Sequence, residues 1–283
     1  MKVITTPKDL KADINAYKKT GQTIGFVPTM GYLHEGHLSL IQTARETADI
    51  VVVSVFVNPT QFGPNEDFDT YPRDLERDAR LAQDAGADLL FHPEVGDIYS
   101  DQDNIDIHVT KRVHTLCGRS RPGHFDGVAT VLTKLFHLVQ PDYVFFGKKD
   151  AQQVAVVDGL IHTFHFPIKL IACETVREPD GLAKSSRNVR LSPEERAEAV
   201  YLNKALTVGA DAIEQGERNS GTIENRVRDY LNRHLQLGTI DYVEVLAYPD
   251  CEPIDRLNGQ VIIAVAVHFP HARLIDNRIV MVC

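Results

Sequence analysis

The sequence has few cysteines and no long hydrophobic run. Its four cysteines, Cys117, Cys173, Cys251 and Cys283, lie far apart and form no CxxC pair, which excludes a zinc knuckle or a disulfide framework and predicts reduced thiols. The most apolar run, Ile50–Val57, is far shorter than the roughly 18–20 residues of a membrane-spanning helix. The amino-terminal residues carry scattered charges and no apolar core, unlike a secretory signal. We therefore expect a cytoplasmic protein that does not bind membranes.

Several common signatures are also missing. The chain has no GxGxxG after a strand, no Walker GxxxxGK[ST], no HExxH and no GxSxG, so a nucleotide site would have to use another loop. Basic residues are outnumbered, 30 against 39 acidic ones, and the formal net charge is −9. This balance disfavours duplex DNA or tRNA as a partner, because such binding depends on neutralising many phosphates. A local basic pocket for one small anion remains possible.

Short apolar runs alternate with helical patterns over the first two-thirds of the chain. Thr6-Pro7 opens the first helix and Gly21 closes it. Further helices are expected at 36–48, 72–85, 127–139 and 152–163, and strands at 23–27, 50–57, 88–91, 143–146 and 168–172. Strands that alternate with helices predict right-handed βαβ units. The fold class is therefore α/β, with a doubly wound parallel sheet in a first domain, residues 1–177.

The last third of the chain has a different pattern. Ser192-Pro193 is a strong helix start, and a second helix is expected at 223–234. Three strand-like runs follow, at 239–247, 260–268 and 278–282. Helices followed by strands predict a second, smaller α+β domain, residues 178–283, joined to the first by a polar hinge at 178–188.

One motif stands between the first buried strand and its helix. The segment Pro28–His37 reads PTMGYLHEGH, and ligands of open α/β sheets bind at the carboxyl ends of strands, where this turn falls. Gly31 and Gly36 allow close approach of a ligand to the backbone, and the following helix N-terminus attracts anions. His34 and His37 are three residues apart, so both rings can face one phosphate. The alternatives are two structural histidines, or two zinc ligands that lack a third.

Polar residues follow two other predicted strands at the same edge of the sheet. Asn58 and Gln61 are neutral donor–acceptors suited to hydroxyl and carboxylate groups of a small substrate, or simply turn residues. In Gly147-Lys148-Lys149-Asp150, a lysine can neutralise phosphate charge and the aspartate can bind a ribose hydroxyl. The alternative for this motif is a solvated lysine pair with a helix-capping aspartate.

Three further segments carry charged side chains. The hinge sequence at 184–188, KSSRN, can close over a polyphosphate, or is a solvated linker. The basic turn Arg119–Phe125 is compatible with carboxylate recognition or with surface structure. Asp74 and Asp78, on the helix predicted at 72–85, are candidate Mg²⁺ ligands, because Mg²⁺ often needs only one or two protein carboxylates plus substrate phosphates.

Taken together, these motifs resemble one enzyme family. PTMGYLHEGH, FVNPTQF, YPRDLERD, RPGHFDGV, FFGKKDAQQ and KSSRN occur in order, and HARLIDN at 271–277 follows near the C-terminus. This set is similar to the pantoate–β-alanine ligase family of the HIGH-motif nucleotidyltransferase superfamily. The resemblance implies a Rossmann-like first domain, a small C-terminal lid domain and a homodimer. It also implies ATP- and Mg²⁺-dependent condensation of (R)-pantoate with β-alanine to pantothenate, AMP and pyrophosphate, through a pantoyl adenylate, in coenzyme A biosynthesis.

The resemblance also implies roles for individual residues. His37, as proton donor, His34 and Lys149 would act in catalysis. ATP would be bound by Met30, Gly31, Tyr32, Leu33, His34, Glu35, Gly36, His37, Gly147, Lys148, Lys149, Asp150, Val176, Lys184, Ser185, Ser186 and Arg187. Pantoate and β-alanine would be bound by Gln61, Gln153, Asn58, Pro28 and Met30. Lys148 and Lys184 depart from the family's usual Glu and Met, and we expect their added charge to keep or tighten ATP binding.

Other functions remain as alternatives. A related nucleotidyltransferase would adenylylate a phosphate-containing metabolite without needing an amine. A relative of class I aminoacyl-tRNA synthetases would share the HEGH and KSSRN signatures, but the acidic charge balance weighs against it. A catalytically silent regulator would bind ATP without turnover. The ligase is favoured, because the motifs for the substrates match as well as those for ATP.

Overall fold

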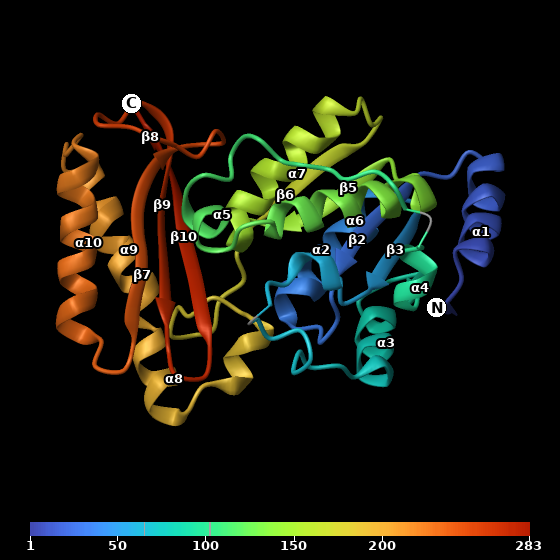
Figure 1. The fold of residues 1–283 in the computed structure, drawn as a ribbon, viewed down its shortest axis with the longest axis horizontal. Helices are drawn as coiled ribbons and strands as arrows, with labels where there is room; N and C mark the ends of the chain where they lie inside the picture. Colours follow the sequence, from blue (N-terminus) through green and yellow to red (C-terminus); the bar gives the residue numbers. More distant parts are fainter. Residues whose placement is uncertain (65, 102) are drawn as a thin grey trace. The chain divides into compact units, whose positions relative to one another are not determined.

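The computed structural model describes residues 1–64, 66–101 and 103–283, and the chain divides into two compact units (Figure 1). The first unit comprises residues 1–109, 121–148 and 156–174. The second comprises residues 110–120, 149–155 and 175–283. The first domain predicted from the sequence, residues 1–177, includes three short segments, 110–120, 149–155 and 175–177, that belong to the second unit.

The first unit is built on a six-stranded sheet. Its order is β1-β4-β3-β2-β5-β6, and every neighbouring pair is parallel. The strands are β1 (Lys2–Ile4), β2 (Ile24–Thr29), β3 (Ile50–Val55), β4 (Leu89–Phe91), β5 (Tyr143–Gly147) and β6 (Lys169–Cys173). The predicted α/β fold with a doubly wound parallel sheet is thereby confirmed. Strand β1 was not predicted, because three residues are too few to show a pattern.

Helices accompany both faces of this sheet. They are α1 (Pro7–Lys19), α2 (Glu35–Thr47), α3 (Leu75–Asp84), α4 (Val95–Ile98) and α6 (His124–Val139), followed by α7 (Ala151–Thr163), whose first turn belongs to the second unit. Helix α3 begins three residues later than predicted, because Asp74 caps it by accepting the N–H of Arg77. Helix α6 begins three residues earlier than predicted, directly after Gly123, whose φ of 81° is left-handed.

The core of the first unit fixes the edge where the polar motifs lie. Ile41 and Ala44 of α2 and Ala82 of α3 pack against apolar residues of β2, β3 and β4. Helix α6 packs against β2, with Phe136 edge-on to Phe26. The strand order reverses between β2 and β5, which are neighbours in the sheet. In such sheets ligands bind beyond the carboxyl ends of the strands at this reversal.

The second unit contains a four-stranded antiparallel sheet of order β10-β9-β7-β8. Its strands are β7 (Thr239–Ala247), β8 (Glu252–Pro253), β9 (Gly259–His268) and β10 (Arg273–Val282), and its helices are α5 (Leu116–Ser120), α8 (Pro193–Ala199), α9 (Tyr201–Glu214) and α10 (Ser220–His234). The predicted α+β organisation is confirmed. The last strand begins five residues earlier than predicted, because Asp276, a buried carboxylate that binds Arg177, interrupts the apolar pattern in its first half.

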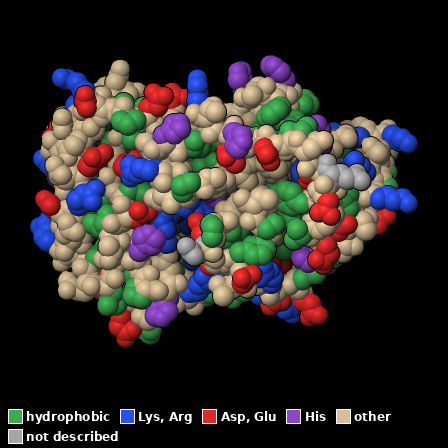
Figure 2. Space-filling view, in the orientation of Figure 1, with side chains coloured by type: hydrophobic (Ala, Val, Ile, Leu, Met, Phe, Trp, Pro, Cys, Tyr) green, Lys and Arg blue, Asp and Glu red, His purple; other side chains and the backbone are tan. Residues whose placement is uncertain are grey.

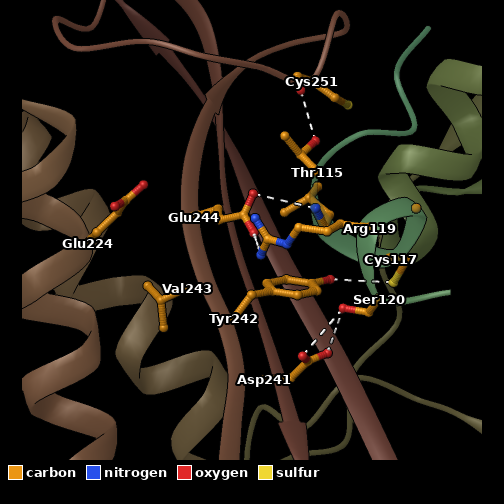
Figure 3. A network of polar contacts seen from close by, with 12 residues as sticks. Thr115, Cys117, Arg119, Ser120, Glu224, Asp241, Tyr242, Val243, Glu244 and Cys251 are labelled. Atoms are coloured by element: carbon orange, nitrogen blue, oxygen red, sulfur yellow. Dashed lines mark hydrogen bonds and ion pairs between the residues drawn. The ribbon is translucent and has the colours of Figure 1, made fainter. Parts of the chain in front are cut away.

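Helix α5 contacts β7 through polar contacts that include a buried one and an exposed one (Figure 3). The Tyr242 hydroxyl lies 3.5 Å from the Cys117 sulfur, and burial raises the pKa of Tyr242 well above its usual value. Arg119 forms an ion pair with Glu244. These contacts explain why residues 110–120 belong to the second unit, although they precede α6 in the chain.

Acidic and basic side chains are intermixed on the face shown in Figure 2. Within residues 1–64, 66–101 and 103–283, no helix combines the length and the apolar character that crossing a membrane requires.

Candidate active site

The loop after β2 is held by a left-handed turn. Gly31 has φ 86° and Tyr32 has φ 50°. A Cβ at Gly31 would lie 2.8 Å from Val55 Cγ1 and 3.0 Å from Asp78 Oδ2, so no other residue fits there without displacing its neighbours. This turn directs the backbone N–H groups of Tyr32 and Leu33 toward the Asp78 side chain on α3.

The Asp78 side chain holds this loop through two hydrogen bonds. Its Oδ2 accepts the Tyr32 N–H at 2.7 Å and its Oδ1 accepts the Leu33 N–H at 2.7 Å. The side chain is 1% exposed. Burial raises the pKa of Asp78 above its usual value, against the opposing effect of the two amide hydrogen bonds and of Arg77. The carboxylate therefore fixes the turn that leads into α2.

The Mg²⁺ role that the position of Asp78 suggested stays a prediction. In this structure the carboxylate is 1% exposed and each of its oxygens accepts a backbone N–H group, which is a structural role. In the part of the chain that the structure describes, no group of three or more His, Cys, Asp or Glu side chains is placed to hold a metal ion. Asp74, the other candidate, caps α3. No residue of this chain is therefore assigned to Mg²⁺.

The two histidines of the loop form the cap of α2. His34 is the N-cap, and its Nδ1 accepts the Gly36 N–H at 3.1 Å. His37 occupies the third helical position, and its Nδ1 accepts the His34 N–H at 3.3 Å. The ring centroids are 4.0 Å apart. An imidazole nitrogen that accepts a hydrogen bond carries no proton, so each neutral ring carries its hydrogen on Nε2. The two rings therefore lie beside each other at the start of α2. That both of them face one phosphate stays a prediction.

We expect Asp78→Asn to lower the free energy of unfolding by about 1–3 kcal/mol at neutral pH, because an amide NH₂ would face a buried backbone N–H. Urea denaturation measures this difference. Asp74→Asn is the matched control on the same helix: asparagine caps as well as aspartate, so its unfolding free energy should change little. Equal losses in the two variants would contradict the proposed brace.

The pKa of Asp78 also sets the sign of a pH effect. Because this pKa is raised in the folded chain, the folded state binds more protons than the unfolded state between the usual pKa of 3.8 and the raised one. The contribution of Asp78 to stability therefore falls as pH rises through that window. We expect the difference in unfolding free energy between wild type and Asp78→Asn to become smaller as the pH rises through this range. A difference that grows with pH would contradict the predicted sign.

The residues after β3 form a second cluster. Asn58, which is 1% exposed, donates from Nδ2 to Gln61 Oε1 at 3.1 Å and to the Gly127 carbonyl at 3.1 Å. Gln61 lies in the short 3-10 helix η1 (Pro59–Gln61), and its Nε2 is 3.2 Å from Met30 Sδ. The cluster thus joins the loop after β3 to the loop after β2, as predicted for residues at one sheet edge.

The basic turn before α6 holds the backbone of Gln61. Arg121 Nη2 and His124 Nδ1 lie 3.3 and 2.8 Å from the Gln61 carbonyl oxygen. Arg121 also binds both oxygens of Glu66, at 2.6 and 2.5 Å. Burial alone would raise the pKa of Glu66, but Arg121 holds it below its usual value. The turn therefore has a structural role, and its predicted use in carboxylate recognition stays a prediction.

The residues after β5 are divided between the units. In the first unit, Lys148 forms an ion pair with Glu174, so its extra charge is paired with a neighbouring carboxylate. The short 3-10 helix η2 (Lys148–Asp150) leads into α7, and in the second unit the Lys149 carbonyl accepts a hydrogen bond from Asn277 Nδ2 at 2.8 Å. Gln152 is buried and binds backbone atoms of residues 112–118. Gln153, the predicted substrate ligand, is half-buried.

The predicted hinge is an ordered segment of the second unit. The Lys184 N–H donates to the Val176 carbonyl at 2.9 Å, and the Lys184 ammonium pairs with Glu178 at 2.8 Å. Ser185 caps the 3-10 helix η3 (Ser186–Arg190) by accepting the Arg187 N–H at 3.3 Å. Lys184, like Lys148, therefore stands beside an acidic partner.

Sequence reasoning missed three residues that support the site. They are Gly127, Glu66 and Tyr99, whose hydroxyl donates to Asn58 Oδ1 at 2.6 Å. Of these, only Gly127 lies in a motif that was noticed, RPGHFDGV, and nothing local distinguished it from a helix glycine.

Comparisons with known proteins identify the family of this chain. The family model described as pantoate-beta-alanine ligase matches residues 2–279. A pantothenate synthetase of Geobacillus sp. (strain WCH70) is 61% identical over 98% of both chains, and that of Bacillus subtilis (strain 168) is 56% identical over 99% of this chain and 97% of its own.

Solved structures match as well. Pantothenate synthetase from Thermus thermophilus has a TM-score of 0.93 at 43% identity and covers 98% of this chain and 99% of its own. Pantoate-beta-alanine ligase from Francisella tularensis, solved with beta-gamma ATP and beta-alanine, has a TM-score of 0.79 at 34% identity over 98% of this chain and 97% of its own. The chain with its histidine-capped loop therefore belongs to the pantoate–β-alanine ligase family, and it joins pantoate to β-alanine with ATP.

Proposed function

We propose that the reaction proceeds in two half-reactions through a pantoyl adenylate. In the first, the pantoate carboxylate attacks the α-phosphorus of ATP, a phosphorus–oxygen bond forms, and pyrophosphate leaves. In the second, the β-alanine amine attacks the activated carbonyl, an amide bond forms, the amine loses a proton, and AMP leaves with the former carboxylate oxygen. The observation that carries this proposal is the histidine-capped start of α2 at the carboxyl edge of the sheet. Such chemistry needs alignment and charge stabilisation more than covalent help.

The phosphates of ATP are proposed to bind at this cap. The Nε2–H groups of His34 and His37 are the proposed hydrogen-bond donors to the phosphates. For proton donation the His37 ring is first protonated to the imidazolium, gives its Nε2 proton to the leaving pyrophosphate and returns to the neutral form. Lys149 is proposed to act as a point cation on charge that develops in the transition state. The proposed ATP ligands remain those that the resemblance implies: Met30, Gly31, Tyr32, Leu33, His34, Glu35, Gly36, His37, Gly147, Lys148, Lys149, Asp150, Val176, Lys184, Ser185, Ser186 and Arg187.

Pantoate is proposed to bind beside Gln61. The Gln61 Nε2 lies 3.2 Å from a thioether sulfur, which is a weak acceptor, so a carboxylate or hydroxyl oxygen would be a better partner for it. Pro28 and Met30 are proposed to contact the apolar part of pantoate, and Gln153 its polar groups. Asn58 is proposed to act on pantoate by holding Gln61, because its own donors are already used. Gln61 is also the proposed contact for β-alanine.

Three further properties are proposals. Mg²⁺ is proposed as the counter-ion of ATP, where it would neutralise phosphate charge, and no protein ligand is assigned to it. The protein is proposed to be a homodimer, as the family resemblance implies. A cytoplasmic location is proposed from the reduced, widely spaced cysteines.

The adenylate is tested by following the carboxylate oxygen. Pantoate labelled with heavy oxygen in its carboxylate is incubated with ATP, Mg²⁺ and β-alanine, and the AMP is analysed by mass spectrometry. We expect one labelled oxygen per AMP, and pantoate-dependent exchange of pyrophosphate into ATP without β-alanine. Unlabelled AMP would refute the adenylate, and transfer of AMP to a phosphate without any amine would favour the related nucleotidyltransferase.

A further inference from the structure

We propose that Tyr99 is a positioning residue for pantoate: acting through Asn58, it fixes the Gln61 amide in the orientation that presents the N–H group to the substrate. This inference rests on the proposed role of Gln61. Tyr99 lies at the end of α4, outside every motif noted in the sequence, and all the residues involved belong to the first unit.

The first step is the polarity of the Asn58 amide. Its Oδ1 accepts the Tyr99 hydroxyl at 2.6 Å and lies 3.0 Å from the Thr60 hydroxyl. Its Nδ2 faces the Gly127 carbonyl, which can only accept. The reversed amide would place two oxygens against each other on one side and remove the acceptor of Tyr99 on the other. Tyr99 and Gly127 thus hold the two ends of Asn58 in one orientation.

The second step passes this orientation to Gln61. Because Asn58 Nδ2 is a donor, the Gln61 atom beside it at 3.1 Å must be the acceptor Oε1. The Gln61 NH₂ group is then turned to the other side, toward Met30 Sδ. Gln61 is 9% exposed, so its amide has little freedom to exchange its ends by turning through water. The Tyr99 hydroxyl therefore sets, through the Asn58 amide, the side to which the Gln61 NH₂ group donates.

Helix α6 contacts both Asn58 and Tyr99. Gly127 accepts from Asn58, and Lys134, seven residues later on the same helix face, holds Tyr99. The Lys134 ammonium donates to the Ile98 carbonyl at 2.8 Å and lies 4.9 Å from the centre of the Tyr99 ring. The ring of Tyr99 is therefore held from helix α6, while its hydroxyl contacts Asn58 and Thr60 on the segment that carries Gln61.

The ionisation of Tyr99 agrees with a donor role. Burial raises the pKa of Tyr99, against the hydrogen bonds to Thr60 and Asn58, and Asp103 raises it further. The phenol thus keeps its proton throughout the neutral and mildly alkaline range, where the donor is needed.

The test is Tyr99→Phe, which keeps the ring and removes only the hydroxyl. We expect KM for pantoate to rise by roughly 3- to 10-fold, as for loss of one buried hydrogen bond, while KM for ATP stays within about 2-fold. Tyr17→Phe on α1 is the matched control and should change neither KM. A purely structural role for Tyr99 predicts a lower melting temperature with KM for pantoate unchanged, or with both KM values raised together, and either result would overturn the inference.

Two further variants separate this inference from the proposed function. If Gln61→Leu leaves KM for pantoate unchanged, the proposed role of Gln61 is wrong and the inference falls with it. If Gln61→Leu raises that KM but Tyr99→Phe does not, only the inference is wrong. Tyr99→Phe added to Gln61→Leu should have no further effect on KM for pantoate, because Tyr99 acts through Gln61; additive effects would overturn the inference.

A second substitution keeps the proposal testable if Tyr99→Phe does not fold. Asn58→Asp replaces the donor that faces Gln61 Oε1 by an acceptor, so the Gln61 amide should reverse. We expect a larger rise in KM for pantoate than in Tyr99→Phe, again with KM for ATP nearly unchanged. An unchanged KM for pantoate in this variant would overturn the inference.

Discussion

Replacing His37 by alanine is expected to slow pantoate-dependent exchange of pyrophosphate into ATP by about 10²- to 10⁴-fold, the range for loss of a positioned proton donor. The geometry supports this expectation, because the Nδ1 of His37 accepts the His34 N–H and the Nε2 of the neutral ring therefore carries the hydrogen. The exchange assay reports the first half-reaction alone, so slow release of AMP does not mask the effect. His162→Ala, at an exposed position on α7, is the control and should leave the rate unchanged.

His37 also caps α2, so the capping role must be separated from the proton-donor role. Glutamine at the third helical position can accept the N-cap N–H, as in a normal capping box, but it is no general acid. We therefore expect His37→Gln to recover the melting temperature of wild type and to remain as slow as His37→Ala. Recovery of the exchange rate in His37→Gln would show that capping, and not proton donation, is the function of this side chain.

The second large effect is expected at Gly127. A Cβ there would lie 2.3 Å from the Thr60 carbonyl oxygen and 2.6 Å from the Gln61 backbone nitrogen. These are backbone atoms, which cannot rotate away as a side chain can, so Gly127→Ala must displace η1 or α6. Overpacking of this kind costs about 1–3 kcal/mol, and a shift of about 1 Å in a substrate-holding group can slow a reaction about 10²-fold.

We therefore expect Gly127→Ala to lower the melting temperature and to lower kcat/KM for pantoate by about 10²-fold or more. Gly96→Ala is the matched control: Gly96 lies in α4, and no atom would lie within 4 Å of a Cβ at that position. Thermal unfolding and initial rates measured on both variants check the prediction. Wild-type kcat/KM in Gly127→Ala would mean that the contact between α6 and η1 does not position Gln61.

Lys148 and Lys184, the two residues that differ from the usual family residues, each form an ion pair. Lys148 and Lys184 were expected to add positive charge near the triphosphate, and that expectation stays a prediction. The structure places Glu174 beside Lys148 and Glu178 beside Lys184. Each added cation therefore has an acidic neighbour. Glu174 is exposed, and such a surface pair contributes little to stability, whereas both Lys184 and Glu178 are half-buried.

The local sequence pattern was sufficient to predict those features that depend on residues close together in the chain. The β-branched run at 50–57 predicted a buried strand, and β3 is buried at every position. Thr6, Ser192 and His34 all lie at helix N-caps near the predicted starts. The order of the motifs along the chain was enough to identify the family. Three of these motifs, those at 28–37, 56–62 and 145–153, accompany β2, β3 and β5, whose carboxyl ends lie at one edge of the parallel sheet.

Contacts between distant residues could not be predicted in this way. Whether Asp78 would hold a metal ion or a backbone turn depends on the Tyr32 and Leu33 amides, 46 and 45 residues away. Position 127 requires glycine because the backbone of η1, more than 60 residues away in the chain, lies against it. The contact between Tyr99 and Asn58 likewise joins residues that are distant in the sequence. The sequence by itself determined the elements, the fold class and the family, because these depend on periodicity and on motif order. Only the tertiary structure decided which polar atoms face one another, because hydrogen-bond partners are set by packing and not by spacing along the chain.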